Sequence, residues 1–135
     1  MRIDLRTRAR EEFVDVTGLV AEAVSGTGAR EGAALVYCPH TTAGIVVNEH
    51  ADPDVAADIM AWLAHACPRD GRWRHAVEGN ADAHVKAALV GTSALVPVRS
   101  GRLDLGTWQG VFFCEFDGPR TRRVMVTALS QATPL

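Results

Sequence analysis

The sequence has few cysteines, and none of them are closely spaced. Cys38, Cys67 and Cys114 are odd in number, and the chain has no Cys-x-x-Cys pair. This pattern argues against a disulfide framework and against a cysteine zinc site. Cys38 and Cys114 lie in apolar runs, so we expect both to be small core residues of a protein from a reducing compartment.

The sequence also lacks an excess of charge and a long apolar run. The formal net charge is −2 over 135 residues, so no basic field draws the chain to nucleic acid or to an anionic membrane. Every apolar run is shorter than the roughly 20 residues that span a bilayer. The N-terminus has no apolar signal-peptide segment. We therefore expect a cytoplasmic protein without a nucleic-acid or membrane partner.

Apolar residues, in contrast, make up 47% of the chain and charged residues 22%, which is ordinary for a globular protein. A chain of this length can bury a core as one domain, residues 1–135. The strands gather toward the C-terminus, which favours an α+β sandwich with a largely antiparallel or mixed sheet. Strand patterns fall at residues 3–7, 13–16, 33–38, 45–47, 94–98, 103–108, 111–116 and 123–129.

Three further segments have the start signals and spacing of helices. Asp52-Pro53 combines a capping aspartate with a proline at the first helical position, and the helix that follows is expected to end near Pro68. Thr17 is predicted to cap an earlier helix. Asn80 or Asp82 is predicted to cap a later one.

Residues 74–84 concentrate the polar chemistry of the chain. His75, Glu78, Asn80, Asp82 and His84 all fall within this stretch. Imidazole and carboxylate bind zinc and similar ions, and they also carry out general acid–base catalysis. A helix first turn favours the neutral, metal-binding form of His84. Asp82 is alternatively only a helix cap.

His40 and Glu49 lie on either side of the strand predicted at residues 45–47. His40 follows a strand break, where side chains often project into clefts, although it is alternatively a turn residue. Glu49 is a candidate general base if its strand lines the same cleft. Glu115, inside an apolar run, lies either on the solvent face of its strand or with a partner in a site.

The segment from Gly101 to Gly110 is rich in small residues. Small residues and a hydroxyl let backbone N–H groups approach a phosphate or carboxylate, so Gly106 and Thr107 are candidates to hold one, with Arg102 as a clamp. The alternative is a hairpin with a bulge at Gly106. The spacing matches no nucleotide-binding motif. We expect this segment and His40 to lie beside residues 74–84.

Taken together, four stretches resemble the YjbQ family, whose members are often labelled secondary thiamine-phosphate synthase. The resemblance covers nearly the whole chain, in order. It implies a compact α/β sandwich that forms a homotrimer, with sites near the subunit boundaries for a divalent metal or an anion. The stretches are Pro39–Gly44, Asn48–Val55, His75–His84 and Gly101–Gly110.

The resemblance implies a metal-assisted enzyme that acts on a phosphorylated small molecule, in one version by a thiamine-phosphate synthase-like condensation that releases pyrophosphate. Imidazole suits zinc and carboxylate suits magnesium, so a metal-dependent hydrolase fits the ligand types at least as well. A non-catalytic trimer that binds a metal or anion, or whose histidines bridge subunits through a metal, is also open. The implied residues are His40, His75 and His84 for the metal, Glu49, Glu78 and Asp82 for catalysis, and Arg102, Gly106, Thr107 and Gln109 for the substrate.

Overall fold

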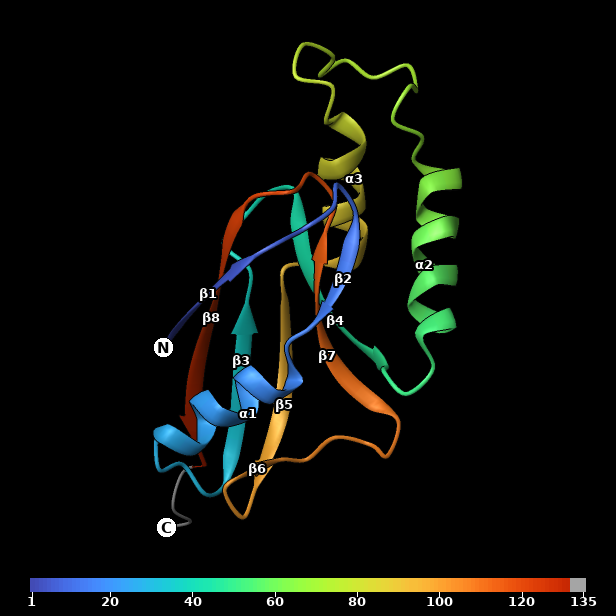
Figure 1. Cartoon of the computed structure of the whole chain (residues 1–135). Helices are drawn as coiled ribbons and strands as arrows, with labels where there is room; N and C mark the ends of the chain where they lie inside the picture. Colours follow the sequence, from blue (N-terminus) through green and yellow to red (C-terminus); the bar gives the residue numbers. More distant parts are fainter. Residues whose placement is uncertain (132–135) are drawn as a thin grey trace.

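Two antiparallel sheets form the body of the chain in the computed structural model, which describes residues 1–131 (Figure 1). The larger sheet has the strand order β1-β8-β3-β5-β6 and the smaller one the order β2-β7-β4. This arrangement confirms the α+β class and the antiparallel pairing. The strands are β1 Arg2–Arg6, β2 Glu12–Asp15, β3 Gly32–Tyr37, β4 Ala43–Glu49, β5 Ser93–Arg99, β6 Arg102–Leu103, β7 Gln109–Glu115 and β8 Thr121–Ser130.

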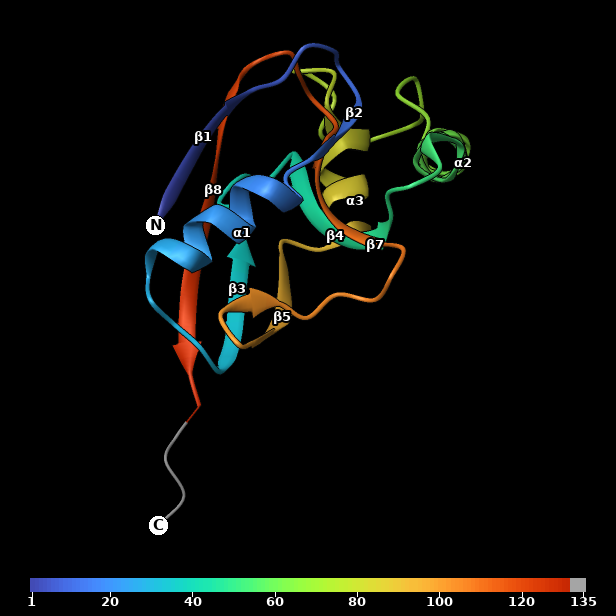
Figure 2. The ribbon, with the colours of Figure 1, turned by 60° about the horizontal axis from the view of Figure 1, so that its bottom comes forward.

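Three helices pack around these sheets: α1 Thr17–Gly26, α2 Pro53–Ala66 and α3 Ala81–Val90. Helix α1 contacts β6, β7 and β8, and α3 contacts β4. The two views of the ribbon show α1 crossing one side of the body, with α3 on the opposite side and α2 outside it (Figures 1 and 2). None of the helices in residues 1–131 is long and apolar enough to cross a bilayer.

The smaller sheet is buried on both faces. Successive side chains of a strand point to opposite faces of its sheet, so the two faces can be followed along β7. On β7, Val111 and Phe113 join the cluster that α1 and the larger sheet form, whereas Phe112 and Cys114 join a second cluster beneath α2 and α3. This double burial explains the unbroken apolar run of β7. The prediction that Cys38 and Cys114 are core residues is confirmed, and burial raises the pKa of the Cys114 thiol.

The predicted helix starts are confirmed in part. Asp52 caps α2 as expected, because its Oδ1 accepts a hydrogen bond of 2.9 Å from the Asp54 N–H. Thr17 is not a cap, since α1 begins at Thr17 with Val16 in the capping position. Asn80 precedes α3, but its side chain makes no capping hydrogen bond because other residues bind it.

The strand predicted at residues 103–108 is wrong. Only Arg102–Leu103 pairs, with β5, and the chain then turns. Gln109 closes this turn, because its Oε1 accepts from the Gly106 N–H and its own N–H donates to the Gly106 carbonyl. A side chain that satisfies backbone groups locally competes with strand pairing.

Helix α2 is loosely attached to the rest of the chain. Leu63 is its only buried residue, and Ile59 packs beside it at the edge of the second cluster. Trp62 remains 64% exposed. An exposed indole on a long helix is an apolar surface that one copy of the chain leaves uncovered.

Candidate functional site

A polar pocket of about 340 Å³ opens at the end of the molecule where α3 begins and β7 turns into β8 (Figure 1). It joins three of the predicted residues, namely His40, Glu78 and His84. Arg122, from the start of β8, forms part of its wall. Residues from three separate parts of the sequence therefore meet here, and we call this space the His40 pocket.

The buried carboxylate of Glu115 holds Arg122 in place. The Arg122 Nε lies 2.7 Å from Glu115 Oε2, and its Nη2 bonds both Glu115 Oε1 and Thr42 Oγ1. Glu115 is fully buried and Arg122 is 4% exposed. Burial alone would raise the pKa of Glu115, but hydrogen bonds from Arg122, the Asp117 N–H and Thr7 lower it below its ordinary value. The pair is therefore ionised, and Glu115 is partnered within a site.

One end of the Arg122 guanidinium has no acceptor within the described chain. Nη1 forms no hydrogen bond with any of residues 1–131, although the other two nitrogens are fully used. It is not a buried orphan, because Arg10 Nε is the one such side-chain atom in that range. Solvent therefore reaches Nη1, and Arg122 lines the His40 pocket. The pocket thus contains a fixed cationic donor without a protein partner.

His40 is held as a neutral imidazole. Its Nε2 accepts a hydrogen bond of 3.0 Å from the Arg123 N–H, so Nδ1 carries the proton in the neutral ring. Burial, together with the charge of Arg122, lowers the pKa of His40 below its ordinary value. The neutral ring donates from Nδ1. It can take a second proton only at Nε2, and the hydrogen bond from the Arg123 N–H is then lost.

A second set of polar groups orders the opposite wall. His75 Nε2 lies 3.1 Å from Asn80 Oδ1, and Asn80 Nδ2 donates to Asp117 Oδ2. Asp117 also accepts from Arg120, at 3.1 Å. The His75 and His84 rings meet edge to face with centroids 5.2 Å apart. His84 lines the His40 pocket, whereas His75 lies in a smaller apolar pocket on the other side of that ring.

Asp82 is placed away from both histidines. It is fully buried and lies between Arg10, at 2.9 Å, and Lys86, at 2.8 Å. Burial would raise the pKa of Asp82, but hydrogen bonds from these two cations lower it. Glu11 completes the cluster against Lys86. The Asp82 carboxylate therefore links α3 to the loop between β1 and β2 and does not line the His40 pocket.

The remaining predicted residues lie elsewhere in the same chain. Glu49 is at the far end of β4 from His40, where its Oε2 accepts from the Asp52 N–H. Arg102 lines a different pocket, at the end of the molecule opposite the start of α3 (Figure 1). Gly106 and Thr107 belong to the turn before β7, and Gln109 is the first residue of that strand. One chain thus does not bring the glycine-rich segment beside residues 74–84, contrary to expectation.

A metal does not fit the described residues of one chain alone. Within residues 1–131 no three histidine, cysteine, aspartate or glutamate side chains lie close enough to share an ion. Of the nitrogens of His40, Nε2 is already bonded. A resident ion would need a ligand from beyond these residues.

Sequence reasoning missed Arg122, Thr42 and Asp117 as pocket residues, and it gave Asn80, in the polar stretch 74–84, only the role of a helix cap. The signal that pointed to the first of these was Glu115, because a carboxylate inside an apolar strand requires a cation. The sequence could not identify that cation, since Arg122 lies across a hairpin among several other arginines.

The chain is similar in sequence to known proteins over nearly its whole length. The family profile described as UPF0047 protein YjbQ-like matches residues 1–131. UPF0047 protein YugU of Bacillus subtilis is 50% identical over 120 residues, which are 89% of this chain and 91% of that protein. UPF0047 protein MJ1081 of Methanocaldococcus jannaschii is 47% identical over 125 residues, 93% of this chain and 90% of that protein.

A solved structure gives the same result for the fold. The crystal structure of an uncharacterized conserved protein of the YjbQ/UPF0047 family from Clostridium acetobutylicum has a TM-score of 0.93 to this chain at 49% identity. The match covers 96% of this chain and 99% of that one. Sequence profile, relatives and fold agree, and the chain belongs to the YjbQ family.

Proposed function

We propose that the His40 pocket binds a phosphorylated small molecule and that His40 and His84 exchange protons with it. The observation that carries the proposal is the free Nη1 of Arg122, a cationic donor on a side chain that is 4% exposed. A buried guanidinium that is already neutralised by Glu115 keeps its position without a ligand. Its remaining N–H groups are therefore preorganised for an anionic oxygen.

The size and polarity of the pocket support a small polar ligand. A volume of about 340 Å³ is near the lower limit for small-molecule sites. His40 Nδ1–H and Thr41 add donors beside Arg122. A phosphate group fits this donor set, because it offers several oxygens with negative charge.

Proton transfer is assigned to the two histidines of the pocket. The lowered pKa of His40 keeps its ring neutral near pH 7, as a general base requires. In a thiamine-phosphate synthase-like condensation, the bond between a pyrimidine methyl carbon and diphosphate breaks while a thiazole phosphate nitrogen bonds that carbon. Arg122 would hold the departing pyrophosphate. In a hydrolase, His40 would instead take a proton from attacking water at Nε2, and the hydrogen bond from the Arg123 N–H would have to break first.

The metal-assisted form of this proposal requires more than one chain. His40, His84 and Glu78 line one pocket, but they do not form a three-ligand group by themselves. A second subunit is the natural source of the missing ligand if the protein is a homotrimer. The exposed Trp62 and Leu89, which line one apolar groove between α2 and α3, support such an assembly.

The decisive experiment titrates pyrophosphate into the wild-type protein and three variants by calorimetry. We expect His40→Ala and Arg122→Lys to bind roughly tenfold or more weakly, because each removes a donor to a charged oxygen. His65→Ala is the control, since His65 lies exposed on α2 outside the pocket. Equal affinity in all four proteins would end the proposal.

Turnover and metal content are measured on the same proteins. Release of pyrophosphate from a pyrimidine methyl diphosphate in the presence of a thiazole phosphate tests the transferase form. Elemental analysis of purified protein, His40→Ala and His84→Ala tests the metal. Saturable binding without turnover would reduce the protein to a binding module, and equal metal content in all three would remove these histidines as ligands.

A further inference from the structure

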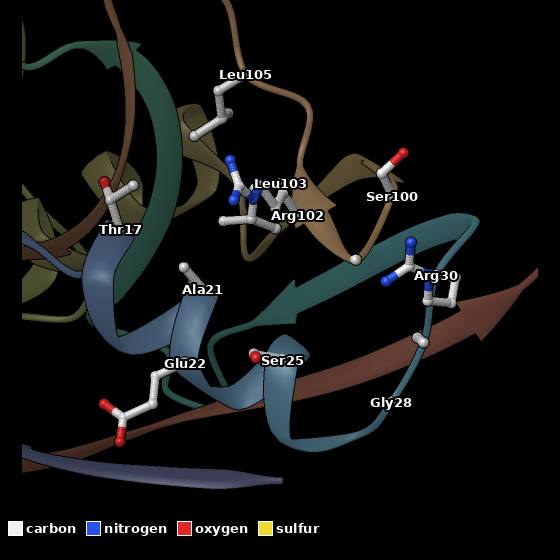
Figure 3. Close-up of a pocket in the computed structure, with 12 residues that line it drawn as sticks. Thr17, Ala21, Glu22, Ser25, Gly28, Arg30, Ser100, Arg102, Leu103 and Leu105 are labelled. Carbon is white, nitrogen blue, oxygen red and sulfur yellow. The ribbon is translucent and has the colours of Figure 1, made fainter.

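A second pocket, of about 740 Å³ (Figure 3), lies by the turn between β5 and β6, at the end of the molecule opposite the start of α3 (Figure 1). Helix α1 forms one wall, and the other wall is the turn between β5 and β6 together with the loop after α1. Two arginines line it, Arg30 and Arg102. None of the candidate catalytic histidines or acids lines this space.

Neither of the two guanidinium groups that line the pocket is paired with a carboxylate within residues 1–131. Neither Arg30 nor Arg102 forms an ion pair or a side-chain hydrogen bond within residues 1–131. In contrast, Arg99, the last residue of β5, pairs with Asp104. Glu22 also lines the pocket, but its carboxylate points away from both guanidinium groups (Figure 3). Two like charges directed at one cavity favour an anion there.

The walls that carry the arginines are tied together. The Gly101 N–H donates to the Arg30 carbonyl at 2.9 Å, and the Ser100 N–H donates to Glu31 Oε1 at 3.0 Å. Gly101 has a φ of 76°, which glycine adopts without strain. Arg30 Nη1 lies 3.6 Å from the place that a Cβ on Gly101 would occupy, so this guanidinium rests on the turn. The arrangement is built before any ligand arrives.

The pocket has a polar side and an apolar side. Ser25 and Ser100 also line the pocket, and neither hydroxyl bonds another of residues 1–131. Ala21, Leu103 and Leu105 supply apolar surface on the same pocket (Figure 3). A ligand that matches both sides carries an anionic head and an apolar body.

We propose that this Arg30–Arg102 site binds an organic phosphate monoester, with its phosphate between the two guanidinium groups and its organic part against Ala21, Leu103 and Leu105. A phosphate dianion offers enough oxygens for two guanidinium forks, whereas a planar carboxylate fills only one fork. The site is separate from the His40 pocket and does not depend on the function proposed for it.

The test titrates phenyl phosphate, inorganic phosphate and benzoate into the intact protein by calorimetry. We expect phenyl phosphate to bind more tightly than either of the other two, because only it has both the dianion and the apolar ring. Arg30→Gln and Arg102→Gln should each weaken its binding roughly tenfold or more, the value of a charged hydrogen bond. Arg99→Gln, the control, should leave the affinity unchanged.

Amide chemical shifts locate the bound ligand. Phenyl phosphate should move the resonances of Ser25, Arg30 and Gly101. Shifts confined to His84 and Arg123 would place it in the His40 pocket and overturn the proposal. Equal loss in Arg99→Gln would reveal unspecific charge attraction, and equal affinity for benzoate would rule out the phosphate assignment.

Discussion

At the scale of single residues, the buried ion pair of Glu115 and Arg122 tolerates substitution least, because each charge depends on the other. Both side chains are buried, and every oxygen of the carboxylate accepts a hydrogen bond. Removal of one partner leaves the other charge in a medium where it is poorly solvated, which typically costs 3–5 kcal/mol or so. The pair therefore couples the stability of the chain to the preparation of the His40 pocket.

Glu115→Gln should lower the free energy of unfolding at pH 7 by roughly 3–5 kcal/mol. The pKa of Glu115 is lower in the folded chain than its ordinary 4.5. Its stabilising effect is therefore present above that value and is lost as the pH falls through the folded pKa. Urea unfolding over a pH series should show the difference between wild type and variant shrinking below pH 4.5.

Glu22→Gln serves as the control for that series, because Glu22 is exposed and has no ion-pair partner within residues 1–131. Its effect should stay within about 0.5 kcal/mol at every pH. A constant difference between wild type and Glu115→Gln down to acid pH would contradict an ionised Glu115.

The individual residues of the candidate site could be predicted only in part from the sequence. His40 and His84 line the same pocket, because histidines at a strand break and at a helix start both project from element ends. Asp82 illustrates the limit, since its local pattern fits a ligand or a cap equally well. Its actual partners, Arg10 and Lys86, include one that is 72 positions away.

At the scale of elements, the junction between β4 and the end of α3 leaves no room for a side chain. A Cβ on Gly44 would lie 2.5 Å from the Gly91 carbonyl oxygen and 3.0 Å from Val90 Cγ1. The same carbonyl accepts the Ile45 N–H at 3.0 Å, so it cannot retreat without breaking a backbone hydrogen bond.

Gly44→Ala should therefore destabilise the chain by roughly 1–3 kcal/mol, the usual cost of overpacking. Gly18→Ala is the matched control, because a Cβ there meets nothing within 4 Å and Gly18 lies in helix α1. That change should stabilise by about 0.5–1 kcal/mol. Thermal unfolding of both variants measures the contrast, and a stabilised Gly44→Ala would refute the described packing.

Asp52→Ala should cost about 1 kcal/mol in urea unfolding, because it removes the side-chain cap of α2. Asp58→Ala changes the same residue type within the helix, where no cap depends on it. The second variant should be neutral or slightly stabilising, since alanine favours helix. Equal losses in the two variants would show that charge, and not the cap, is what matters.

The existence of most elements could be predicted from local pattern, but their ends and partners could not. The helical spacing after Asp52-Pro53 and the apolar run of β7 are both confirmed. The segment 103–108 failed because the Gln109 side chain, invisible to periodicity, closes a turn on Gly106. The strand order β1-β8-β3-β5-β6 depends on contacts between distant residues, which no local pattern contains.

At the scale of the whole molecule, the apolar groove between α2 and α3 remains uncovered in one chain. Trp62 is 64% exposed and Leu89 59% exposed, and both line this groove. The homotrimer of our functional proposal would cover such a surface and bring residues of separate chains together.

Light scattering should therefore give three times the mass of one chain. Trp62→Glu should shift the protein toward single chains, because a charge replaces apolar contact area at the interface. Leu19→Glu, on α1 and 44% exposed, is the control and should keep the wild-type mass. A wild-type protein that runs as single chains at all concentrations would exclude the assembly.

The three free cysteines, all of them buried, make the rate of thiol alkylation a measure of how often the folded chain opens. Because burial raises the pKa of the Cys114 thiol, the folded chain offers an alkylating reagent almost no thiolate at that position. Cys114 lies on the middle strand of the smaller sheet, so the reagent must wait for α3 and that sheet to part. The rate of Cys114 alkylation would then report how often this part of the core opens, and no label would have to be introduced.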